Sequence, residues 1–125
     1  MKFQPDKANT QTITAYVPGW VAVDGQRFEH ALLITSQGLL QPWCQAPFES
    51  LTAQDFAPLA QLGCELVIFG SGQRLRFPKP PWLAPLMAQR IGLESMDTAA
   101  ACRTYNILAG EGRKVAAVLL IEAPT

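Results

Sequence analysis

The first third of the chain alternates apolar and polar positions with the period of two that is typical of β-strands. Thr12–Val17 is rich in β-branched residues, which favours a strand there. Trp20–Val23 predicts a second strand, and Asp24-Gly25 predicts a tight hairpin turn after it, because both turn positions tolerate positive φ. The same pattern predicts a return strand over 28–34 and a short strand over 39–43. Together these segments predict an N-terminal β-meander.

The rest of the chain alternates helical patterns with short apolar runs. Each expected helix has a capping or stop signal, and the three helices cover 52–62, 81 or 82–91, and 97–109. The apolar runs after them are expected to be strands, of which the first and last are buried on both faces: 64–69, 93–96 and 115–121. A meander followed by alternating helices and strands predicts an α/β fold, a three-layer sandwich around a mixed sheet.

Composition narrows the class of protein. The 125 residues suit a single domain over 1–125, and with 49% apolar and 16% charged residues the chain can bury a substantial core. The net charge is zero and no basic run is present, so no nucleic-acid partner is expected. The longest apolar stretch, Val115–Ile121, is far shorter than the ~20 residues of a membrane-spanning helix.

Cysteine and histidine content bears on compartment and cofactors. Met1–Asp6 lacks the apolar core of a secretory signal, and the three cysteines (Cys44, Cys64 and Cys102) form no C-x-x-C pair. With His30 as the single histidine, no metal site is predicted, and no cofactor is expected. These features predict a cytoplasmic protein with reduced thiols.

Two segments place backbone N–H groups where an anion could bind. Gly70-Ser71-Gly72 follows the most buried predicted strand, and Asp97-Thr98 starts the third helix. If the strands before them are parallel neighbours, both segments border one crevice at the carboxyl edge of the sheet. A tight turn and an ordinary helix N-cap are the alternative interpretations, and they need no ligand.

The third helix carries an unusual polar group. Cys102, Arg103 and Asn106 lie on a helix otherwise poor in charge, and Arg103 could hold a carboxylate beside Cys102 or Tyr105. Alternatively, Arg103 pairs with an acid, and Tyr105 and Asn106 satisfy buried backbone groups. A nucleophilic Cys102 would need a base, and His30 lies far away in sequence. No catalytic residue is therefore assigned.

Two weaker candidates follow the Gly70–Gly72 turn. Arg74, Arg76 and Lys79 form a small basic cluster that could attract an anion or remain solvated. Phe77–Trp82 is rich in proline and aromatic residues and could form an exposed apolar patch, alone or with Trp43, Pro47 and Phe48. Burial of these aromatic residues in the core is the alternative.

The third helix and the following strand resemble a known family. Met96–Leu108 and Glu111–Ala117 resemble the signature of the Mth938-like domain family, supported by Gly70-Ser71-Gly72 (often Gly-Thr-Gly in relatives) and Arg76-Phe77-Pro78. The resemblance covers nearly the whole chain and implies three layers around a mixed five-stranded sheet. It also implies kinship with the adipogenesis-associated domain protein and with a mitochondrial assembly factor for respiratory complex I. No catalytic activity is established across the family.

Three hypotheses follow for function. The first is a non-catalytic interaction or assembly module, assisting a respiratory, complex I-like membrane enzyme through a protein partner. The second is a binder of a small anion, or an enzyme acting on one, in the crevice whose candidate residues are Gly70, Ser71, Gly72, Asp97, Thr98, Cys102, Arg103 and Asn106. The third assigns all these residues to the fold alone. The chain is expected to be a monomer or a homodimer.

Overall fold

A computed structural model describes residues 11–123 of the chain. Met1–Asp6, on which the expectation about a secretory signal rests, lie outside the described residues. Two sheets are present in this part of the chain: an antiparallel sheet in the order β1-β2-β3 and a larger sheet in the order β5-β4-β8-β6-β7. The strands are β1 (Ile13–Val17), β2 (Trp20–Val23), β3 (Gln26–Phe28), β4 (Leu32–Thr35), β5 (Leu40–Pro42), β6 (Leu66–Gly70), β7 (Gly92–Met96) and β8 (Val115–Leu119).

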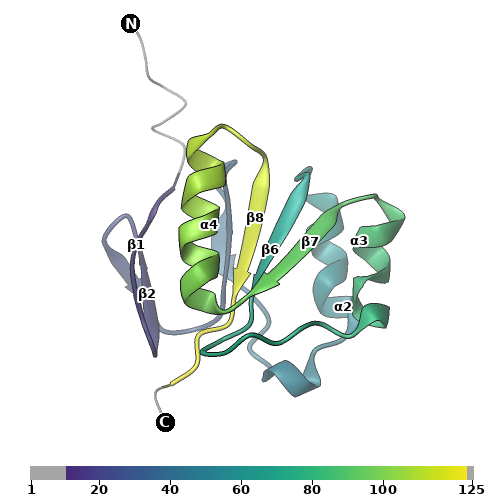
Figure 1. Ribbon diagram of the computed structural model, residues 1–125, viewed down its shortest axis with the longest axis horizontal. Helices are drawn as coiled ribbons and strands as arrows, with labels where there is room; N and C mark the ends of the chain where they lie inside the picture. The colour runs from purple at the N-terminus through teal and green to yellow at the C-terminus, as the bar shows by residue number, and fades with distance from the viewer. Residues whose placement is uncertain (1–10, 124–125) are drawn as a thin grey trace, which may run out of the picture.

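The larger sheet is mixed and five-stranded, as predicted. β4 pairs antiparallel with both of its neighbours, β5 and β8, whereas β6 pairs parallel with both β8 and β7. Helix α4 (Thr98–Gly110) and the three-stranded sheet lie on one face, and α2 (Ala53–Phe56) and α3 (Ala84–Ala88) lie on the other (Figure 1). The predicted three-layer α/β architecture is therefore confirmed.

The predicted return strand over 28–34 is in fact two strands in different sheets. β3 closes the hairpin at Asp24 (φ +49°) and Gly25 (φ +87°), where the sequence predicts the turn. The chain then crosses at residues 29–31 and enters the larger sheet as β4. β3 has two exposed residues, whereas every residue of β4 is buried. An alternating pattern shows that a segment is extended but does not show which sheet it joins.

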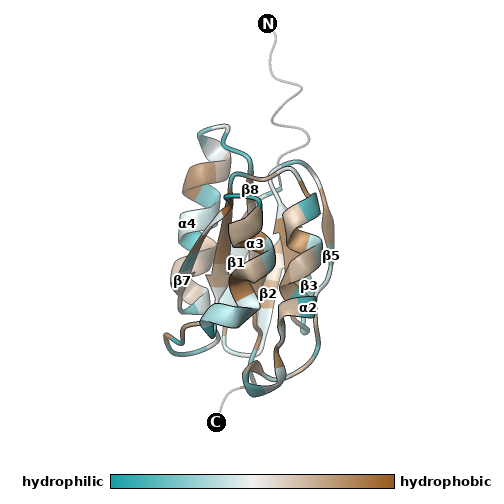
Figure 2. Ribbon diagram, turned by 90° about the vertical axis from the view of Figure 1, so that its right-hand side faces the viewer, coloured by the Kyte–Doolittle hydropathy of each residue, from teal (hydrophilic) through white to brown (hydrophobic). Residues whose placement is uncertain are grey.

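The hydrophobic core has two parts, one on each face of the larger sheet, and β8 contributes to both. Every residue of β8 is buried, which explains its wholly apolar sequence. Val115, Ala117 and Leu119 face α4 and the smaller sheet, whereas Ala116 and Val118 face α2 and α3. Figure 2 shows the hydrophobic residues concentrated on the strands between the helices.

The first two predicted helices are shorter and more broken than expected. The first begins with the predicted capping box, in which the Thr52 amide donates to the Asp55 carboxylate at 2.7 Å. Short 3₁₀ turns flank or extend both helices: η1 (Phe48–Ser50), η2 (Ala57–Gln61) and η3 (Pro80–Leu83). Prolines break the hydrogen-bond pattern because they have no N–H to donate, and η2, η3 and α3 each have one near the start.

The second helix also ends earlier than predicted. It stops at Ala88, the chain reverses at Arg90 (φ +58°), and Gly92 begins β7 instead of ending the helix. Within residues 11–123, none of the helices combines the length and apolar character needed to span a membrane.

Candidate functional site

The Gly70–Gly72 turn lies where the carboxyl ends of two parallel strands meet. β6 and β7 are neighbours, with Gly70 opposite Met96, so the geometry on which the crevice hypothesis depends is present. The Ser71 amide donates to the Met96 carbonyl at 2.9 Å, and the Gly72 amide donates to Thr98 Oγ1 at 2.9 Å. These two N–H groups, which the sequence offers to an anion, are therefore engaged within the protein.

Asp97 and Thr98 join the start of α4 to the strands around it. Thr98 is fully buried, and its hydroxyl donates to the Leu120 carbonyl at 2.8 Å while accepting from Gly72. Its amide donates to the Gly72 carbonyl at 2.8 Å. The Asp97 carboxylate accepts from the Ala100 amide at 2.8 Å and caps the helix. Each residue thus has a role in the fold, and a ligand role for them stays a prediction.

Steric constraints explain why the turn contains glycine. A Cβ on Gly70 would lie 3.1 Å from the Ala101 Cβ and 3.1 Å from Thr98 Oγ1, so α4 packs directly against this backbone. Gly72 has φ +104°, and a Cβ there would collide with the Glu122 carboxylate. The close approach of α4 also accounts for the small residue at position 101.

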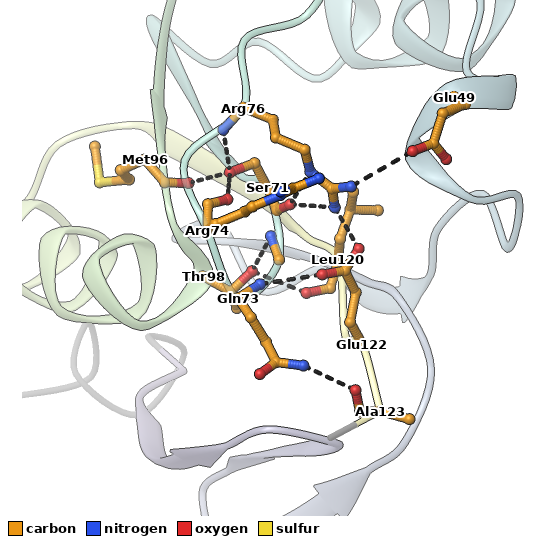
Figure 3. Close-up of polar contacts among 11 residues, drawn as sticks. Glu49, Ser71, Gln73, Arg74, Arg76, Met96, Thr98, Leu120, Glu122 and Ala123 are labelled. Atoms are coloured by element: carbon orange, nitrogen blue, oxygen red, sulfur yellow. Dashed lines mark hydrogen bonds and ion pairs between the residues drawn. The ribbon is translucent and has the colours of Figure 1, made fainter. Parts of the chain in front are cut away.

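Arg76 is the centre of a hydrogen-bonded network beside this turn (Figure 3). Its Nε and Nη2 donate to the Ser71 carbonyl at 3.0 and 2.6 Å, and Nη2 also pairs with the Glu122 carboxylate. Nη1 lies 3.8 Å from a Glu49 carboxylate oxygen, and the guanidinium stacks 4.6 Å above the Phe48 ring. Arg76 therefore differs from Arg74 and Lys79, the other members of the predicted basic cluster, because its charge is paired with carboxylates within the protein.

Cys102, Arg103 and Asn106 lie elsewhere, on the side of α4 that meets β1. The Asn106 side chain donates to the Ile13 carbonyl at 2.7 Å and accepts from the Ile13 amide at 2.9 Å. These three residues help to line a shallow pocket of about 240 Å³ between the helix and the strand. The structure thus distributes the predicted site residues over two places, and Asn106 satisfies backbone groups as one of the alternatives proposes.

The chemistry of the Cys102 thiol opposes nucleophilic catalysis. Burial raises the pKa of Cys102 to about 12, and the Arg103 charge lowers it only in part. A thiol with this pKa holds a negligible thiolate fraction at neutral pH. Burial also raises the pKa of Tyr105, whose hydroxyl donates to the Gln11 carbonyl at 3.2 Å.

A larger cavity of about 670 Å³ adjoins the turn, and the sequence did not reveal it. Four segments line it: 29–31, 44–48, 73–74 together with Arg76, and 120–123. His30 Nδ1 lies 3.0 Å from the Ala31 carbonyl. Burial raises the pKa of Cys44, another lining residue. The four segments are distant in sequence. Of the residues that line the cavity, only Arg74 and Arg76 were predicted from the sequence to attract an anion.

The expected aromatic patch is mostly internal. Trp43 and Trp82 are only 9% and 8% exposed, and both belong to the core cluster that includes Phe56 and Phe69. The prediction of an exposed patch that includes these two tryptophans is therefore wrong, and the alternative, burial in the core, is correct for them. Their rings fill the space between the sheet and α2. Phe77 is 68% exposed and remains at the surface.

One protein family matches nearly the whole of the described chain. The profile described as "Protein of unknown function (DUF498/DUF598)" matches residues 13–120. The chain belongs to the DUF498/DUF598 family. A Mth938-like domain from Bordetella pertussis, solved by NMR, is similar to this family member at 32% identity with a TM-score of 0.79, over 100% of this chain and 94% of that one. The predicted resemblance to Mth938-like domains is confirmed.

Other relatives of this DUF498/DUF598 protein span bacteria and animals. A crystal structure from Bordetella parapertussis is 38% identical with a TM-score of 0.84, over 90% of this chain and 97% of that one. An uncharacterised Rhodobacter capsulatus protein is 32% identical over 94% of this chain and 90% of its own length. The bovine NADH dehydrogenase [ubiquinone] 1 alpha subcomplex assembly factor 3 is 29% identical over 86% of this chain. The match spans 59% of the bovine protein's length.

Proposed function

We propose that this DUF498/DUF598 protein is a non-catalytic interaction module that assists the assembly of a respiratory NADH dehydrogenase, a complex I-like membrane enzyme. One observation carries the proposal: the similarity to NADH dehydrogenase assembly factor 3 from cattle extends over 86% of this chain. The human and Xenopus tropicalis proteins of the same name match over 94% and 95% of it. The aligned part therefore corresponds to the whole folded unit rather than to one element.

The chemistry of the described residues supports binding over catalysis. The hydroxyls of Ser71 and Thr98 and the guanidinium of Arg76 bond to backbone carbonyls within the protein. Cys102 is held as a thiol by burial. Side chains committed in this way stabilise a fixed shape, which is what a docking module needs.

The test is removal of the gene in the organism that encodes it. We expect membranes of the deletion strain to contain less fully assembled NADH dehydrogenase on native gels and to oxidise less NADH. Expression of the wild-type protein should restore both, and succinate dehydrogenase, assembled separately, serves as the control. Unchanged amounts of assembled NADH dehydrogenase in the deletion strain would refute the proposal.

A second candidate function, binding of a small anionic ligand, is supported by the cavity of about 670 Å³ beside the Gly70–Gly72 turn. A cavity of this size is within the range of small-molecule sites. Arg74 is exposed, lines the cavity and has a guanidinium that can pair with a carboxylate or phosphate. Native mass spectrometry of the purified protein should detect a retained ligand that is lost in Arg74→Gln and kept in Arg103→Gln. Identical unliganded spectra for all three proteins would exclude this candidate.

A further inference from the structure

The antiparallel ladder between β4 and β8 opens at one end, beside the cavity of about 670 Å³. The last pair at this end joins Leu32 to Leu119. If the ladder continued, residues 30–31 would lie opposite 120–121, but these residues line the cavity instead. The cavity therefore occupies the place where the pairing of the two strands stops.

The alternation of the ladder directs the backbone of Ile121 into this opening. Successive residues of an antiparallel strand point their N–H and C=O groups to opposite sides. The Val115 carbonyl at the start of β8 accepts from the Ser36 amide, on the side of β4, at 2.9 Å. The Leu120 amide donates to the Gly70 carbonyl of β6 at 2.9 Å, on the opposite side. Ile121 has the phase of Val115 and therefore points toward β4.

His30 has the complementary orientation on the other chain. The Ala31 carbonyl accepts from the Trp43 amide, just after β5, at 2.9 Å, so the backbone of His30 points away from β5 and toward β8. Within residues 11–123, no hydrogen bond engages the backbone N–H or C=O of His30 or Ile121. Both residues are half-buried. Unpaired backbone groups of this kind are a template for another extended chain.

Contacts on both sides hold the opening apart. The Gln73 amide donates to the Glu122 carboxylate at 3.1 Å, and its side chain donates to the Ala123 carbonyl at 2.8 Å (Figure 3). Arg76 also pairs with Glu122. On the other side, residues 29–31 lead to β3, which belongs to the smaller sheet. An opening that is fixed in this way loses little conformational entropy when it is filled.

The charges that line the cavity select no net charge in an occupant. Glu29 and Glu122 carry negative charge, whereas Arg74 and Arg76 carry positive charge. An anion would therefore meet carboxylates as well as Arg74. A peptide backbone is neutral and alternates hydrogen-bond donors with acceptors, so it matches this lining better than an anion does.

We propose that the cavity binds an extended peptide segment of a protein partner, which pairs with Ile121 on one side and with His30 on the other. In such strand addition, main-chain hydrogen bonds supply affinity and neighbouring pockets receive side chains. Pro47 and Phe48 line the cavity and offer an apolar wall to a side chain of the peptide. This inference rests on the proposed function as an interaction module, and it names the form in which the partner is recognised.

Selection from a phage-displayed library of random peptides tests this inference on the purified protein. We expect enriched peptides, and a synthetic copy should bind Ile121→Pro at least about tenfold more weakly than wild type, because proline has no N–H to donate. Ile121→Val is the matched control, since it keeps both the N–H and a β-branched side chain, and it should bind like wild type. In the wild-type protein, hydrogen exchange of the Ile121 amide should slow when the peptide binds.

The Ile121 amide has no partner in the fold within residues 11–123, so Ile121→Pro should remain folded, which circular dichroism will verify. A library that yields no binder would overturn the inference, as would equal binding by Ile121→Pro and Ile121→Val. Unchanged exchange at Ile121 in the wild-type complex would also overturn it. Each of these results leaves the assembly proposal intact, because the deletion strain tests that proposal without peptides. Conversely, normal NADH dehydrogenase in the deletion strain would not remove a measured peptide site.

Discussion

At the end of β6, close packing leaves no room for a side chain at two glycines. Gly70 has α4 against its backbone, and Gly72 combines positive φ with a neighbouring carboxylate. The sequence predicted a turn here from the two glycines, and it also allowed an anion-binding loop. The hydrogen bonds of Ser71 and Gly72 to residues about 25 positions away hold the turn in place, and no local pattern encodes those bonds. An anion-binding role for the turn stays a prediction.

The substitution Gly72→Ala tests this packing. The new Cβ would be strained at φ +104° and would displace Glu122, so we expect the free energy of unfolding to fall by about 2–4 kcal/mol. Urea denaturation measures it. Gly110→Ala is the matched control, because no atom lies within 4 Å of its added Cβ, and alanine in a helix should change stability by less than about 1 kcal/mol. Equal effects of the two substitutions would show that the contact is unimportant.

Cys102 gives a prediction in alkaline solution. Burial raises its pKa from 9.0 to about 12, so between these values the folded protein keeps a proton that the unfolded chain has lost. Stability should therefore be unaffected by this group below pH 9 and should decline as the pH rises from 9 to 12. Urea midpoints across this window should fall more steeply for wild type than for Cys102→Ala. Parallel slopes would mean that the thiol titrates as it does in the unfolded chain.

At the scale of elements, α4 fixes both sheets relative to each other. Thr98 joins its first turn to β6 and to the end of β8, and Asn106 bonds to both backbone groups of Ile13 in β1. The sequence predicted the helix, its Asp97 cap and its close packing. One of the alternatives drawn from the sequence has Asn106 satisfying backbone groups, but the sequence could not identify Ile13 as the partner, since it lies 93 residues away.

The substitution Asn106→Ala should loosen β1 without unfolding the larger sheet. The Ile13 amide donates to Asn106 Oδ1, so its hydrogen exchange should accelerate by at least about tenfold. The amides of β8, which is wholly buried, should keep their protection. The neighbouring exposed residue supplies the control variant, Arg103→Ala, which should leave Ile13 exchange unchanged. Slow exchange at Ile13 in Asn106→Ala would contradict this role.

At the scale of the whole molecule, periodicity predicted the layers well and the surface poorly. The wholly apolar sequence of 115–121 places that segment at the centre of the sheet, because both faces of β8 are covered. The division of the meander between two sheets has no such signal, since β3 and β4 share one alternating pattern. The cavity beside Arg74 needs four distant segments to meet, which only the folded chain reveals.

The proposed assembly role belongs to the same scale, because the similarity that supports the proposal covers the folded unit and not one residue set. An assembly factor binds incomplete forms of its client and leaves the finished enzyme. Two-dimensional native electrophoresis of membranes from the encoding organism, with quantitative mass spectrometry of each gel slice, tests this directly. We expect this protein to migrate with partial assemblies of NADH dehydrogenase and to be absent from the complete enzyme. Migration with the complete enzyme, or with none of its subunits, would contradict the assembly role.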